Sequence, residues 1–148
     1  KVINLIEQDT IRLLRECDAG IKMGISSIDD VLDYTENSEL KSCLIKSREE
    51  HEEVKSNLLE LLNEYHDEGK EPSAMAKSMS WIKTNVKLAV NESDDVVADL
   101  ITDGCNMGVK SLFKYLNQYK SADEKSKNIT KRLINLEENL MANMRKFL

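Results

Sequence analysis

The near absence of helix-breaking residues is the feature that most limits what this chain can fold into. Its 148 residues include 5 glycines and 1 proline. A β-sandwich or barrel needs many turns and uses glycine and proline to make them. Charged residues make up 32% of the chain and aromatic residues 5%, a composition typical of long helices when breakers are scarce. The sequence therefore predicts an all-α protein.

Apolar residues recur at steps of three and four along four long segments. In the first segment, Ile21, Ile25 and Ile28 fall on one helical face, and the other segments repeat this spacing. Short polar turns join the first long helix to the second and the third to the fourth, so each pair forms an antiparallel hairpin. The expected long helices cover residues 2–34, 39–67, 95–119 and 124–147, and a shorter helix covers 74–90.

The clearest break, at residues 68–73, contains Gly69 and Pro72 and separates the two hairpins. A connection that includes the 74–90 helix is long enough to return the chain along the whole bundle. We therefore expect a single domain over residues 1–148, built as a four-helix bundle with one long crossover.

An internal repeat relates the two hairpins. Residues 20–28 and 104–112 both read G-x-x-M-G-(Ile/Val)-x-S-(Ile/Leu), which indicates a duplicated hairpin and a pseudo-two-fold bundle. Glycine inside a helix costs about 1 kcal/mol relative to alanine. The matched pairs Gly20/Gly24 and Gly104/Gly108 are therefore expected to permit close backbone approach where helices cross.

Two such hairpins joined by a long crossover resemble the ferritin-like superfamily. The stretch from Trp81 to Asp95, which leads into the helix of Gly104, looks like a bacterial ferritin-like family of unknown function in which a short tryptophan-containing helix precedes the third bundle helix. The resemblance spans nearly the whole chain. It implies a ferritin-like bundle and a place for a di-iron site, held by a Glu from each of two helices and a Glu-x-x-His from each of the other two.

Most ligands of that di-iron site are missing from this sequence. His51 keeps a ligand's place, but Arg48 stands three residues before it instead of Glu, and Glu137 has no histidine three residues later. In the other two helices the small-residue register places the ligand positions near Cys17 and Ile101, neither of which is a carboxylate. The di-iron site is therefore expected to be lost, with no cofactor, and enzymatic activity is disfavoured.

A remnant mononuclear metal site is the alternative. Asp18, Asp103 and Glu137 lie at or beside the inward stripes and could join His51 around iron or another divalent metal. A buried Arg48 would repel the metal and pair with these carboxylates. The competing interpretation is a hydrogen-bonded polar layer of His51, Arg48 and nearby acids that fixes the helix register.

Charge and cysteine content limit the partners. The chain has 21 Lys+Arg against 27 Asp+Glu, and this net charge of −6 disfavours nucleic acids. No apolar run approaches the roughly 20 residues of a membrane span. Three cysteines without a C-x-x-C pair are expected as reduced thiols in a cytoplasmic protein. The missing initiator Met suggests a trimmed fragment, with an upstream segment absent from view.

The leading functional hypothesis is a non-catalytic bundle that acts through its surface. It would self-associate, as a homodimer paired along a helix face, or dock a protein partner. The alternative is a divergent metal-binding protein, a di-iron-type oxidoreductase or a metal storage protein. A small-molecule sensor bundle, which would need an internal cavity, is a third hypothesis.

Overall fold

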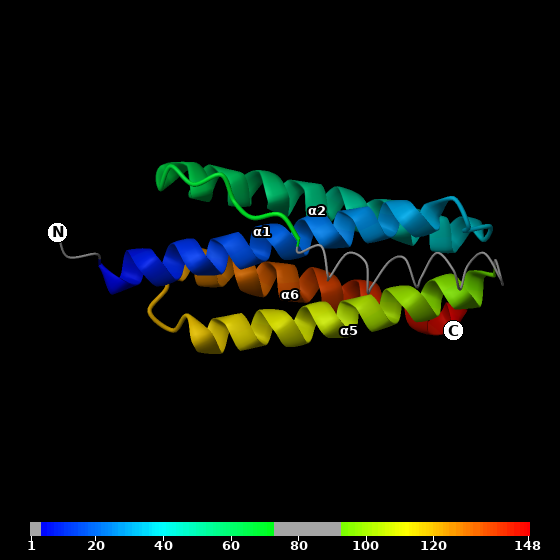
Figure 1. Ribbon diagram of the computed structural model, residues 1–148. Helices are drawn as coiled ribbons and strands as arrows, with labels where there is room; N and C mark the ends of the chain where they lie inside the picture. The colour runs from blue at the N-terminus through cyan, green and yellow to red at the C-terminus, as the bar shows by residue number, and fades with distance from the viewer. Residues whose placement is uncertain (1–3, 73–92) are drawn as a thin grey trace.

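The computed structural model describes residues 4–72 and 93–148, and these residues form a bundle of four long helices without strands (Figure 1). The all-α prediction is thereby confirmed for the described residues, and the predicted 74–90 helix lies outside them. The helices are α1 (Leu5–Leu32), α2 (Ser38–Glu64), α5 (Asp94–Gln118) and α6 (Glu124–Met144), and the 3₁₀ turn η2 (Arg145–Phe147) follows α6.

Polar residues fix where the helices begin and end. The side chains of Asn4, Asn37 and Asp123 accept hydrogen bonds from backbone amides in the first turns of α1, α2 and α6. Helix α2 ends at Glu64, before the predicted residue 67, because His66 has a φ of 56°, which an α-helix cannot accommodate. The other boundaries lie close to the predicted ones.

Contacts between helix ends and turns establish the direction of each helix. At the start of α1, the Asp9 carboxylate accepts a hydrogen bond from the Ser121 amide in the α5–α6 turn, at 3.0 Å. At the start of α5, the Asp94 carboxylate accepts one from the Glu36 amide in the α1–α2 loop, at 2.9 Å. Helices α1 and α6 therefore run in one direction and α2 and α5 in the other, as Figure 1 shows. The connection from α2 to α5 must return the chain to the opposite end of the bundle.

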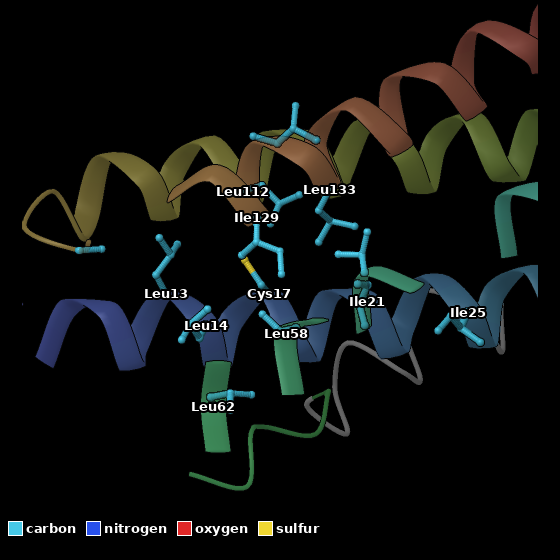
Figure 2. Packing of buried hydrophobic residues seen from close by; sticks show 13 residues of the cluster. Leu13, Leu14, Cys17, Ile21, Ile25, Leu58, Leu62, Leu112, Ile129 and Leu133 are labelled. Atoms are coloured by element: carbon cyan, nitrogen blue, oxygen red, sulfur yellow. The ribbon is translucent and has the colours of Figure 1, made fainter. Parts of the chain in front are cut away.

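Buried apolar side chains form two separate clusters along the bundle axis. The first lies toward the start of α1, where side chains of α1 and α2 meet Leu112, Ile129 and Leu133 of α5 and α6 (Figure 2). The second lies toward the α1–α2 loop and includes Ile28 and Leu44. Helices α2 and α5 occupy diagonal positions, with α1 and α6 between them. In the described part of the chain, no helix combines the length and apolar character that crossing a membrane requires.

Candidate functional site

A histidine–glutamate pair occupies the gap between the two apolar clusters. Nε2 of His51, on α2, lies 2.6 Å from Oε1 of Glu137, on α6. The His51 side chain is 0% exposed and that of Glu137 is 12% exposed. On α6 the first cluster ends at Ile134 and the second begins at Leu140, so Glu137 lies between them. The pair therefore forms a polar layer between the two apolar clusters.

The acceptors around the imidazole assign a hydrogen to both of its nitrogens. Nδ1 lies 2.7 Å from the carbonyl oxygen of Ser47, which can only accept a hydrogen bond, while Nε2 faces the carboxylate of Glu137. Burial alone would lower the pKa of His51, but the hydrogen bond and charge of Glu137, together with the Ser47 carbonyl, outweigh it and raise the pKa. The contacts therefore favour the imidazolium form of His51 beside Glu137.

Two glycines of the repeat make room for this pair. A Cβ on Gly24 of α1 would lie 3.3 Å from Cδ2 of His51, and a Cβ on Gly108 of α5 would lie 3.3 Å from Oε2 of Glu137. The matched second glycines of the two repeats thus approach the pair from different helices. They provide space for side chains rather than for the predicted contact between backbones.

The first glycine of the first repeat, Gly20, makes no such space. Gly20 is exposed, and a Cβ there would meet nothing within 4 Å, so the predicted packing role of Gly20 is wrong. Gly20 is exposed because the inward face of α1 passes through the neighbouring buried residue Ile21. Gly104 is half-buried, and its packing role stays a prediction.

Cys105 on α5 is a further partner of the pair, and the sequence predicts it only as a reduced thiol. Burial raises the pKa of Cys105, and the charge and hydrogen bond of Glu137 raise it further. The Cys105 thiol therefore stays protonated beside Glu137. Spacing is the sequence signal that indicates this contact, because Cys105 precedes Gly108 by one helical turn and lies on the same inward face of α5.

The four predicted metal ligands do not converge. Asp103 is exposed on α5, because it lies on the side of the helix opposite the buried Ile101 and Cys105. Asp18 is six residues before Gly24 on α1 (18 to 24), about 9 Å along the helix axis. Of the predicted set, only His51 and Glu137 meet. Among the residues that the structure describes, no group of three His, Cys, Asp or Glu side chains could hold a metal ion.

Asp18 instead holds the loop that follows α2. Its buried carboxylate accepts the backbone amide of Lys70 at 2.9 Å and pairs with Nζ of Lys22 at 2.8 Å. Gly69 has a φ of 87°, and a Cβ there would collide with the Asp18 carboxylate. The loop therefore needs glycine at this position, both for its backbone conformation and for its contact with α1.

Arg48 lies outside the polar layer, contrary to the prediction. Its side chain is 36% exposed, with Nε 2.5 Å from Oδ1 of Asp29 and Nη1 3.7 Å from Oε1 of Glu52. The residue three positions before His51 is rotated by about 60° around the helix, which turns Arg48 toward the edge of α1. The polar layer is confirmed for His51 and Glu137, and the inclusion of Arg48 was wrong.

The predicted ligand register on α1 and α5 was also wrong. Gly24 and Gly108 lie against the pair, and they follow Cys17 and Ile101 by seven residues each (17 to 24 and 101 to 108). Neither glycine has a side chain, so neither of these positions can supply a ligand atom to the layer.

Comparisons of this chain with protein-family models, with curated proteins and with solved structures gave no match. The interpretation of the site therefore depends on the residues and contacts described above.

Proposed function

We propose that this chain is a divergent, non-catalytic ferritin-like bundle that acts through its surface, by self-association or by docking a protein partner. The observation that carries the proposal is that the polar layer leaves neither ring nitrogen of His51 without a partner. Both nitrogens of His51 face acceptors, and the two helices that do not contribute to the pair present Gly24 and Gly108. The packing of α1 with α2 and of α5 with α6 supports the proposal.

The chemistry of the pair favours a structural role for it. A general acid or base must reach a substrate, whereas His51 is fully buried and bound on both sides. A buried ion pair adds little net stability, but it penalises every helix register that would separate its two charges. The layer would therefore specify one arrangement of the four helices. The free cysteines Cys17, Cys43 and Cys105 support the further proposal of a cytoplasmic location.

Elemental analysis distinguishes this proposal from the divergent metal protein. The chain is produced in medium supplemented with iron, zinc and manganese, purified without chelator, and compared with the His51→Leu variant. We expect far less than one equivalent of any metal in either protein. One equivalent in the wild type that is lost in the variant would replace our proposal with the metal-binding, oxidoreductase or storage alternative.

Sedimentation velocity tests the surface role. We expect the sedimentation coefficient of the pure chain to rise with protein concentration, as it does for a reversible dimer. A strictly monomeric chain would remove self-association from the proposal. A pull-down with the folded chain as bait would then have to recover a stoichiometric protein partner, or the surface role fails altogether.

A further inference from the structure

Helix α5 carries two exposed, large apolar side chains near its middle. Met107 is 62% exposed and Phe113 is 49% exposed, and they lie six residues apart (107 to 113), about 9 Å along the helix. The other large apolar side chains that are exposed in the described part of the chain lie at helix or chain ends or far apart on α2. They are Leu5, Ile6, Ile45, Leu59 and Leu148.

The charges of α5 are separated along its length. Residues 94–103 include four aspartates and no basic residue, whereas residues 110–118 include two lysines and no acid. The helix dipole favours acids in the first turn and bases in the last turn. It does not account for Asp103, in the tenth position of the helix, or for Lys110, eight residues from its end.

Three of these charges have no counter-charge among residues 4–72 and 93–148. Asp103, Lys110 and Lys114 are exposed, and none of them forms an ion pair with another residue in the part of the chain that the structure describes. Lys110 and Lys114 are also four residues apart on one helix face, where like charges repel. By contrast, three charges on α2 are paired with other elements, as Glu53 is with Arg132 at 3.1 Å.

We propose that a second copy of this chain docks on α5, antiparallel to it, about a two-fold axis between residues 108 and 109. This proposal rests on the proposed self-association and names its surface. In this register Asp103 of each copy lies opposite Lys114 of the other, because both are equally far from the axis. Met107 lies opposite the aliphatic stem of Lys110, and Phe113, which is turned about 90° around the helix from this face, lies at its edge.

The charge pattern selects both the occupant and its orientation. The separated charges of α5 are complementary to a second α5 only when the two helices run in opposite directions, since parallel helices would place aspartate beside aspartate. Met107 is the one large apolar side chain of each copy on this face, so the ion pairs contribute much of the specificity. The dimer is therefore expected to weaken as salt is added.

Sedimentation velocity on the full chain, with charge reversals, tests this surface. We expect D103K and K114D each to weaken the dimer at least about tenfold, because each reversal acts twice across the two-fold axis. The double variant D103K/K114D exchanges the two charges and should restore the dimer to within about threefold of wild type. E138K, at an exposed acid of α6, is the matched control and should leave the dimer unchanged.

Each outcome supports or overturns the inference. A dimer that resists D103K and K114D would show that self-association uses another face, which refutes α5 docking but leaves the proposed function intact. A monomeric wild type would refute α5 docking and the self-association on which it rests, and the pull-down would then decide whether partner docking survives. Failure of the double variant to recover would refute the antiparallel register. Circular dichroism checks the helix content, and if a reversal lowers it, D103N and K114Q replace the reversals with a smaller expected loss.

Discussion

Replacing the buried pair with apolar residues tests whether His51 and Glu137 form one interacting unit. The variants are His51→Leu, Glu137→Met and the double variant, since these side chains approximate the volumes that they replace. In Glu137→Met, the imidazole loses its carboxylate and Nε2 is left without a partner inside a closed core. In His51→Leu, the carboxylate keeps the Cys105 thiol but loses its counter-charge.

The burial of the pair sets the expected free energies. An unpartnered buried polar group costs about 1–3 kcal/mol, and an uncompensated buried charge costs about 3–5 kcal/mol. Because His51 can release its proton and the Glu137 side chain is 12% exposed, we expect each single variant to lose about 2–3 kcal/mol. The double variant leaves neither group behind and should lie within about 1 kcal/mol of wild type. Urea unfolding followed by circular dichroism at pH 7 measures all four proteins.

An exposed pair on the same two helices provides the matched control. Arg132 of α6 and Glu53 of α2 lie 3.1 Å apart, with side chains 43% and 69% exposed. Their cycle, with Arg132→Met and Glu53→Gln, should show a coupling below about 1 kcal/mol. If the losses of His51→Leu and Glu137→Met simply add in the double variant, the pair does not act as a unit and the polar-layer interpretation is refuted.

Three more outcomes follow from the site. Gly20→Ala should stabilise the chain by about 0.5–1 kcal/mol, whereas Gly24→Ala should destabilise it because the new Cβ presses on His51; thermal unfolding separates the two. The wild type should exceed His51→Leu in free energy of unfolding by the largest margin below about pH 6.5, and this margin should shrink as pH rises through the raised pKa of His51. Urea unfolding of both proteins from about pH 6 to 9 measures the margin, and a margin that grows with pH would contradict the prediction. Cys43, half-buried, should be the only thiol that iodoacetamide labels in the folded chain, as mass spectrometry can verify; labelling of a buried thiol before unfolding would oppose this.

The helices could be predicted closely because the signals that define them are local. Each long helix has its own apolar stripe, and polar residues such as Asn37 stand at its start. The early end of α2 could not be predicted, because a positive φ at His66, a residue other than glycine, leaves no mark in the sequence. The predicted return of the chain along the bundle agrees with the opposite positions of the end of α2 and the start of α5.

The site was predicted only in part, because its geometry depends on how the helices slide past one another. A shift of seven residues turns a helix by only about 20° relative to its neighbours, so Cys17 and Gly24 fall on the same apolar face. Periodicity therefore cannot decide which of them lies level with His51. The same reasoning explains why Asp18 was placed at the site, although it binds the loop after α2.

The contacts between the first turn of α1 and the α5–α6 turn have a consequence for how the protein is made. The Asp9 carboxylate accepts a hydrogen bond from the Ser121 amide, and the Thr10 hydroxyl accepts one from the Asp123 amide. These contacts span 112 and 113 residues of sequence. A ribosome delivers the chain from its N-terminal side, so α1 emerges long before these partners exist. The hairpin of α1 and α2 can form early from nearby residues, but these contacts can close only after the α5–α6 turn has been synthesised. Until then the apolar face that α1 later shares with α5 and α6 stays uncovered, and this interval is when the nascent chain is most exposed to aggregation.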